Sequence, residues 1–290
     1  MDIDYPRGRI KLHSHKQISR ISKKFGSPSR ASLVPATQDF AKFGEEAFVS
    51  QDVEAELSEE RRARYRSLVP SLLYLATTTR PDISYSVGTL CRFMESPSEA
   101  HLRGAETVLS YLVKTSTHGI VFQKDKSFEL SARYSPLKDG LVGLSDSSWS
   151  TGKSISGYVL LLAGVAVVWA CKRQPVTSLS STEAEYYAAS SCGAEILYVR
   201  HLLHDLGCPQ HSPTPLLVDN SACVSLGKDP GTCKRARHID RRVYFLSDYQ
   251  EMGDLQLFYV STKDNVADVF TKPLEKAQFS KHRDVLVTDG

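Results

Sequence analysis

The longest apolar run in the chain, Tyr158 to Ala170, most strongly limits the possible fold. Gly164 stands at its centre, with YVLLLA before it and VAVVWA after it. Both halves are rich in residues that favour strands, and the glycine permits a tight turn between them. The run is also shorter than the roughly 18 apolar residues that a membrane-spanning helix needs. We therefore expect two buried, adjacent strands here, with no transmembrane segment and no membrane partner.

Strands and helices alternate on both sides of this pair. The apolar patterns predict strands near residues 120–123, 141–146, 157–163, 165–171, 215–219 and 255–260. Helical patterns fall near 181–205, 220–228 and 237–251, and a last helix is expected from about residue 265. Three antiparallel strands followed by helix, strand, helix and strand predict an α/β fold, with a mixed sheet and flanking helices.

Composition divides the chain into three predicted ranges. Residues 1–60 hold a basic piece, a Ser/Pro-containing stretch and an acidic segment, and we expect a short hairpin and helix followed by a linker. Residues 61–118 predict helices that are broken at the sequence TTTRPD. Pro70 is awkward in the first of these helices, because an interior proline costs about 3 kcal/mol. Residues 119–290 form the α/β range.

Charge and cysteine content limit the partners and the compartment only weakly. The net charge of +3 means that any nucleic-acid surface must be a local patch. The six cysteines include no CxxC pair, and 290 residues can bury a core without disulfides, so we expect reduced thiols. The first 30 residues contain no apolar run typical of a secretory signal. These features favour an intracellular location.

Four acids stand in separate local contexts along the α/β range. Asp146 (LSDSSW) and Asp219 (LLVDNSA) end predicted strands, Glu185 (SSTEAEYYAA) lies early in a helix, and Asp268 (DNVADVFTKP) opens one. Two carboxylates about 4 Å apart repel by roughly 4 kcal/mol at an effective dielectric of 20, so gathered acids need cations. Mg²⁺ and Mn²⁺ accept oxygen ligands, and a pair of such ions can clamp a phosphodiester during hydrolysis. The set predicts a metal-dependent nuclease, although each acid alone also suits a turn or an exposed helix position.

Longer motifs surround these acids. Residues 144–274 contain SDSSW, SISGYVLL, SSTEAEYYAA, VDNSA, RHID and VADVFTKPL, and closely resemble the ribonuclease H domain at the end of copia-type retrotransposon polyproteins. Upstream, the stretch from YRSLVPSLLYL to AETVLSYL resembles the end of the adjoining reverse transcriptase, and IKLHSHKQISRISKKFG a still earlier part. The resemblance implies a ribonuclease H-like mixed sheet with flanking helices, preceded by a truncated, mainly helical reverse transcriptase remnant. Met1 matches a position inside a strand of the polymerase, so we expect that domain to be cut.

The resemblance also implies which residues act. The catalytic and metal-binding acids fall on Asp146, Glu185, Asp219 and Asp268, with two Mg²⁺ (or Mn²⁺) ions as cofactors and an RNA/DNA hybrid as substrate. Glu185 matches the family better than Glu183 does, because it directly precedes the aromatic residue that begins the buried helix face. The reaction implied is endonucleolytic hydrolysis of the RNA strand. The Tyr-x-Asp-Asp motif of the polymerase is missing from the sequence, so we expect no DNA synthesis.

A basic segment supplies candidates for nucleic-acid binding. The residues are Lys234, Arg235, Arg237 and His238. Cations here could hold phosphates with an affinity that falls as salt rises. An exposed basic turn, with the histidine packing or capping a helix, is the alternative.

Copia-derived fragments among the secreted effectors of oomycete plant pathogens give a different hypothesis. Glu59, Glu60 and Arg61 in LSEERR resemble the Glu-Glu-Arg translocation motif of RxLR-class effectors, although a solvated helix end is the alternative. That resemblance implies secretion, entry into the host cytoplasm or nucleus, and suppression of plant immunity or cell death through an unidentified host protein. A decayed fold that only binds nucleic acid or protein is a third hypothesis.

Overall fold

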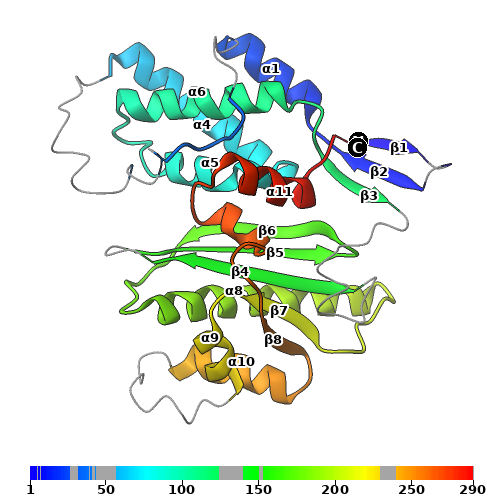
Figure 1. Ribbon diagram of the computed structural model, residues 1–290. Coiled ribbons are helices and arrows are strands. Elements are labelled where there is room, and N and C mark those ends of the chain that lie inside the picture. Colours follow the sequence, from blue (N-terminus) through cyan, green and yellow to red (C-terminus); the bar gives the residue numbers. More distant parts are fainter. Residues whose placement is uncertain are drawn as a thin grey trace. The chain divides into compact units, whose positions relative to one another are not determined.

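The chain forms two compact units in the computed structural model. The structure describes residues 1–4, 6, 8–26, 32–38, 40, 43, 57–123, 140–149, 153–228 and 240–289. One unit combines Met1–Lys124 with Lys272–Gly290, and the other is Asp125–Thr271. Figure 1 shows helices and a small sheet in the first unit, and a larger sheet with helices in the second. Within the described residues, no helix has both the length and the apolar composition needed to cross a bilayer.

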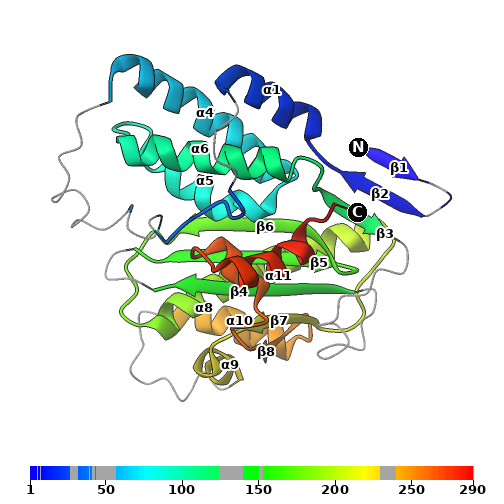
Figure 2. The ribbon, with the colours of Figure 1, turned by 45° about the horizontal axis from the view of Figure 1, so that its top comes forward.

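The first unit is mainly helical. Its helices are α1 (His15–Phe25), α4 (Glu59–Thr78), the 3-10 helix η1 (Pro81–Ile83), α5 (Ser84–Cys91), α6 (Glu99–Lys114) and α11 (Lys276–Leu286). A three-stranded antiparallel sheet follows the order β1 (Asp2–Asp4), β2 (Arg9–Leu12) and β3 (Ile120–Gln123). Helices α4, α5 and α6 pack together around buried apolar side chains, and Figure 2 shows them as one group.

Helix α4 accommodates its proline. The Ser58 side chain accepts a hydrogen bond from the Arg61 backbone N–H at 3.4 Å, and Glu59 and Glu60 lie in the first turn, where a helix dipole favours acids. Pro70 lies inside the helix with its side chain exposed, and the helix continues past it to Thr78. The buried leucines on the other side stabilise this continuous helix through packing.

The predicted break at TTTRPD is a buried polar network. The Arg80 guanidinium donates to both carboxylate oxygens of Asp82, at 2.9 and 2.8 Å, and to the backbone and side-chain oxygens of Thr115. The Tyr111 hydroxyl donates to the same carboxylate at 2.6 Å. Arg80 is fully buried and Asp82 is 1% exposed. These bonds fix the chain between α4 and α5 and connect it to the end of α6.

The C-terminal segment belongs to the first unit. Thr288 forms an antiparallel bridge with Gly119, with distances of 3.0 and 2.9 Å between the backbone nitrogen and oxygen atoms. The Phe279 ring also contacts the Tyr111 ring edge-on. The structural division therefore differs from the predicted range 119–290 at both ends. Contacts between residues that are far apart in the sequence determine this division, and the local composition of the chain gives no indication of such contacts.

The second unit contains a five-stranded mixed sheet in the order β6-β5-β4-β7-β8. The strands are β4 (Leu141–Ser148), β5 (Ile155–Leu162), β6 (Val165–Arg173), β7 (Thr214–Val218) and β8 (Leu255–Tyr259). The first three are antiparallel, whereas β7 is parallel to β4 and β8 is parallel to β7. The predicted pair of strands around Gly164 is β5 and β6, and the glycine has a φ of 73°, which suits a tight turn.

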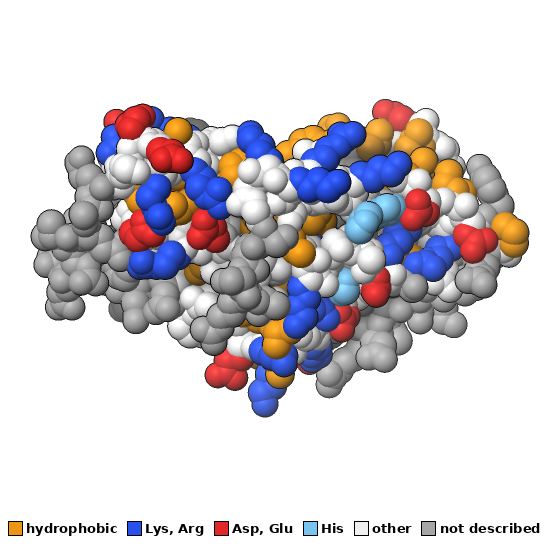
Figure 3. Space-filling model, turned by 90° about the horizontal axis from the view of Figure 1, so that it is seen from above, with side chains coloured by type: hydrophobic (Ala, Val, Ile, Leu, Met, Phe, Trp, Pro, Cys, Tyr) orange, Lys and Arg blue, Asp and Glu red, His pale blue; other side chains and the backbone are white. Residues whose placement is uncertain are grey.

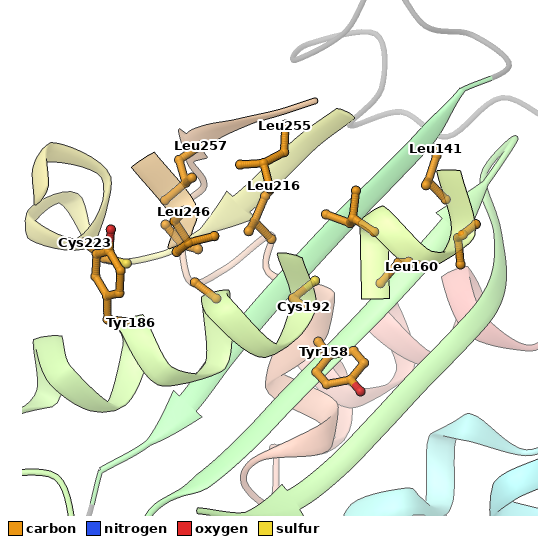
Figure 4. Close-up of a cluster of buried hydrophobic side chains, with 14 of the residues drawn as sticks. Leu141, Tyr158, Leu160, Tyr186, Cys192, Leu216, Cys223, Leu246, Leu255 and Leu257 are labelled. Atoms are coloured by element: carbon orange, nitrogen blue, oxygen red, sulfur yellow. The ribbon is translucent and has the colours of Figure 1, made fainter. Parts of the chain in front are cut away.

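Three helices accompany this sheet: α8 (Ser181–Asp205), α9 (Ser221–Lys228) and α10 (Asp240–Glu251). Figure 4 shows the core that α8 forms with the strands, including Leu160, Cys192 and Leu216. Gly143 permits this close packing, because a Cβ there would lie 2.8 Å from the Ile196 side chain and 2.9 Å from the Cys192 sulfur. This ribonuclease H-like mixed sheet with flanking helices confirms the predicted fold class, and the first unit confirms the mainly helical remnant.

The helix predicted from residue 265 is shorter and tighter than expected. A 3-10 helix, η3, spans Val266–Phe270, and the next α-helix, α11, starts only at Lys276. The Asn265 side chain caps η3 by accepting from the Ala267 N–H at 3.1 Å, and its amide donates to the backbone oxygen of Ser145 on β4 at 2.9 Å. This side chain therefore attaches η3 to the central strand.

Candidate active site

Three of the four predicted acids meet in the second unit. Asp146 lies near the end of β4, Glu185 lies near the start of α8, and Asp219 directly follows β7. Each offers a carboxylate oxygen, and these oxygens all lie within 4.8 Å of one another. The parallel pairing of β4 with β7 brings the ends of those strands together, and α8 lies against β4. Asp146 and Glu185 are buried, with 1% and 7% of their surfaces exposed.

Glu183 and Glu185 have different roles at the start of α8. The Glu183 carboxylate accepts a hydrogen bond from the Leu179 backbone N–H at 2.7 Å, and its own N–H donates to the Ser180 hydroxyl at 3.1 Å. Glu185 instead accepts from the Ser147 N–H on β4, at 3.2 Å. Glu183 therefore caps the helix, and Glu185 joins the acids.

Two threonines that sequence reasoning missed contact the site. The Thr262 hydroxyl donates to the Asp219 carboxylate at 2.9 Å, and the Thr271 hydroxyl donates to the Asp146 carboxylate. Each threonine lies outside the motif of the acid that it touches, 43 and 125 residues away in the chain. The sequence contains one indication of Thr271, which is its position in the motif VFTKP, three residues after Asp268.

Asp268 lies outside the group of three. It is fully buried in η3, where its backbone oxygen lies 3.2 Å from the Thr271 hydroxyl that donates to Asp146. The structure thus connects Asp268 to the site through Thr271, but it does not place its carboxylate within the 4.8 Å cluster. A metal-binding role for Asp268 stays a prediction.

Burial and mutual repulsion disfavour the simultaneous ionisation of all three carboxylic acids of the cluster. Burial, with the neighbouring charges of Asp146 and Asp219 adding to it, raises the pKa of Glu185 to about 9. Burial and the charges of Glu185 and Asp219 also raise the pKa of the Cys223 thiol on α9. Without a cation, the site therefore favours a protonated Glu185 at neutral pH.

The residues fit a divalent cation. One carboxylate oxygen of Glu185, Oε2, is buried and accepts no hydrogen bond from the described residues. Such an oxygen is costly to bury unless a donor or a positive ion reaches it. Hard ions such as Mg²⁺ take carboxylate oxygens as ligands, and three carboxylates suit them well. The cluster is consistent with divalent metal use.

Other predicted residues have different positions. Lys234, Arg235, Arg237 and His238 lie outside the described residues. The Glu59–Arg61 tripeptide forms the first turn of α4, where the Arg61 guanidinium pairs with Glu99. The five described cysteines are free thiols. On the face seen in Figure 3, Lys and Arg side chains are interspersed with Asp and Glu.

Comparison with known sequences decides the family. The chain is 36% identical over 219 residues to the retrovirus-related Pol polyprotein from transposon RE1 of Arabidopsis thaliana, covering 74% of this chain and 14% of that protein. It is also 35% identical over 139 residues to the secreted RxLR effector protein 161 of Plasmopara viticola, covering 47% of this chain and 90% of that protein. The chain belongs to the family of retrotransposon Pol polyproteins. It spans about 14% of the length of its RE1 relative. No protein-family model matches it.

A solved structure of similar fold is the N-terminal RNase H domain of rv2228c from Mycobacterium tuberculosis, studied as a fusion with maltose-binding protein. It shares 12% sequence identity with this Pol-family chain and covers 50% of this chain and 96% of that one, at a TM-score of 0.35. This TM-score lies below 0.5, so the fold assignment rests on the strand order β6-β5-β4-β7-β8 and the site on the positions of its own carboxylates.

Proposed function

We propose that this Pol-family chain is a copia-type ribonuclease H that hydrolyses the RNA strand of RNA/DNA hybrids and makes no DNA. The observation that carries the proposal is the cluster of Asp146, Glu185 and Asp219, with ligand oxygens within 4.8 Å of one another. The buried, unpartnered Oε2 of Glu185 and its raised pKa support a cation at this point. Transposon relatives that share up to 36% identity support the same assignment.

In this proposal the acids hold two Mg²⁺ or Mn²⁺ ions. Asp146, Glu185 and Asp219 would hold the ions with their carboxylate oxygens, and Asp268, whose backbone oxygen lies beside the Thr271 hydroxyl, would be the fourth ligand that the sequence predicts. Bound ions of this kind supply Lewis acidity that stabilises charge on the oxygens of a phosphodiester. Thr271 and Thr262 hold the carboxylates of Asp146 and Asp219 by donating to them. Selection of RNA requires a contact to the 2′-hydroxyl, which DNA lacks.

Cleavage of a labelled RNA/DNA hybrid by the purified full chain tests the proposal. We expect cutting of the RNA strand with Mg²⁺, and none with EDTA. Asp219→Asn and Glu185→Gln should each abolish it. Glu183→Gln is the matched control, because it changes an acid two residues away that caps α8 and should leave cutting intact. Well-folded wild-type protein that fails to cut the hybrid contradicts the enzymatic proposal.

Similarity to the secreted RxLR effector protein 161 favours a second candidate, an effector acting on a host plant protein. In that case the chain is secreted and suppresses plant immunity or cell death, whereas the ribonuclease H proposal fits an intracellular location. Expression of wild-type protein and of Asp219→Asn in plant cells separates the two. Equal suppression of cell death by both proteins supports an effector role without catalysis, and no suppression by either protein contradicts it.

A further inference from the structure

Two exposed cations lie at the same end of the sheet as the acids. On β4, Ser147 directly follows Asp146 and pairs with Ser156 of β5, which pairs in turn with Lys172 of β6. The next row ends at Arg173. Two strand spacings therefore separate β4 from Lys172, roughly 10 Å. Both cations are exposed, and neither forms an ion pair with the residues that the structure describes.

An exposed indole lies beside the same strand end. Trp149 follows β4 directly, three residues after Asp146, and 51% of its surface is exposed. Its Nε1–H donates to the backbone oxygen of Ser178 at 3.2 Å. Ser178 lies two residues before Ser180, the N-cap of α8. Val176 and Leu179 in the same segment are also exposed, at 49% and 74%.

A buried chain of hydrogen bonds holds this segment in place. The Ser178 hydroxyl donates to the Gln174 side chain at 2.7 Å. The Gln174 amide donates to the Ser156 hydroxyl at 2.9 Å and to the backbone oxygen of Ala184 at 3.0 Å. Gln174 is 1% exposed and Ser178 is 3% exposed. The support of Trp149 is therefore connected to β5 and to the residue that precedes Glu185.

The combination identifies the class of ligand. A rigidly supported, half-exposed aromatic face suits stacking on a base or a sugar, and every base offers such a face. Exposed Lys and Arg suit phosphates. Acidic peptides would also meet the cations, but the neighbouring cluster of three acids disfavours them and suits only a ligand that arrives with divalent cations.

We propose that Trp149, Lys172 and Arg173 form a binding surface for one strand of the nucleic acid. Trp149 packs on a base or sugar beside the scissile phosphate. Lys172 and Arg173 project to opposite faces of the edge strand β6, so both contact phosphates where the same nucleic-acid strand passes this edge of the sheet. This inference rests on the proposed function, since it names the positioning residues for that reaction. None of the three residues touches the reacting atoms.

Fluorescence and kinetics test this surface in the full chain. Trp149 and Trp169 are the two tryptophans of the sequence, so Trp169→Phe leaves Trp149 as the one reporter. Adding Asp219→Asn stops cleavage during a titration with the RNA/DNA hybrid. We expect the Trp149 emission to change and to saturate. In the cleaving protein, Trp149→Ala should raise KM about tenfold with kcat within about twofold, because stacking on an aromatic contributes binding. Trp149→Phe should retain most of the affinity.

Salt dependence tests the cations. The Lys172→Gln/Arg173→Gln variant should lower the slope of log affinity against log salt by about 2, as the loss of two phosphate contacts predicts. Lys16→Gln/Arg20→Gln, which removes two exposed cations from α1, is the matched control. Unchanged Trp149 emission and an unchanged KM, in a chain that cuts the hybrid, overturn this inference alone. A wild-type chain that does not cut the hybrid overturns the proposed function instead.

Discussion

The two units both bury charged side chains, but they balance the charge differently. In the first unit, buried Asp82 faces Arg80 and accepts from Tyr111, so the guanidinium and the hydroxyl hold its pKa below the usual value against the opposing effect of burial. In the second unit, buried Glu185 faces two further acids, and its pKa rises. A complete internal pairing indicates a structural role. A cluster of like charges indicates a role that needs a cation from outside.

The largest effect should come from breaking the complete pairing. Asp82→Ala leaves the buried Arg80 without its carboxylate, and we expect a loss of about 3–5 kcal/mol in the unfolding free energy. Urea unfolding followed by far-UV circular dichroism measures it. The matched control is Arg80→Met/Asp82→Leu, which removes both charges and should cost much less. A double variant that is as unstable as Asp82→Ala contradicts the interpretation.

The second unit should respond to metal where the first does not. Both tryptophans lie in Asp125–Thr271, so tryptophan fluorescence reports the unfolding of this unit. At a Mg²⁺ concentration of about 100 times Kd, binding to the folded state should add about 2.7 kcal/mol to its stability. Asp219→Asn should lose most of this gain. Asp82→Asn, a charge removal in the other unit, should keep it, and an equal loss in both variants would falsify the assignment of the cation to the acid cluster.

The stability of the metal-free second unit should fall as the pH rises. Glu185 binds its proton more tightly in the folded protein, with a pKa near 9 against 4.5 for an ordinary glutamate, so the folded state holds more protons between these values. The contribution of Glu185 to the stability of the unit is therefore fully present below about pH 4.5 and is lost as the pH rises toward 9. Glu185→Gln should stabilise the unit at pH 8 by about 1–3 kcal/mol and have little effect at pH 4.

The control for this pH dependence is Glu183→Gln. Glu183 lies on the same helix and caps it, so its variant should keep the wild-type slope of stability against pH. Urea unfolding in EDTA at several pH values, followed by tryptophan fluorescence, provides the measurement. A wild-type stability that increases from pH 5 to pH 8 is the outcome that this account forbids.

Local patterns predicted much of the second unit and little of its polar support. The apolar run around Gly164 predicted β5 and β6, because adjacent buried strands need only neighbouring residues to be recognised. The positions of Asp146, Glu185 and Asp219 at strand ends and a helix start likewise anticipated their meeting. Thr271 and Asn265 were missed, since their partners on β4 lie 125 and 120 residues away. A single sequence carries no periodic signal for such pairs.

The same reasoning explains the error in the last helix and the different division into units. The Asn265 side chain donates to the backbone of β4 and caps only a short 3-10 helix. The helix prediction used only the apolar pattern of the residues after position 265, and that pattern carries no information about the bond to β4. Gly119 and Thr288 pair although 169 residues separate them in the sequence, so the segment after Thr271 joins the first unit and not the range 119–290 to which it was assigned from the sequence. Long-range hydrogen bonds overrode local preference in both places.

The smallest expected effects compare one helix cap in each unit. Ser58 caps α4 and Ser180 caps α8, each by accepting a backbone N–H three residues on, at 3.4 and 3.1 Å. Ser58→Ala and Ser180→Ala should each cost about 1 kcal/mol, because the two caps are chemically alike. Only Ser180→Ala should also reduce the stabilisation by Mg²⁺, since fraying of α8 loosens Glu185, which lies five residues inside the helix from its cap. Thermal unfolding with and without Mg²⁺ compares the variants. An equal Mg²⁺ gain in both would mean that the bond from Ser147 to Glu185, rather than the start of α8, positions this carboxylate.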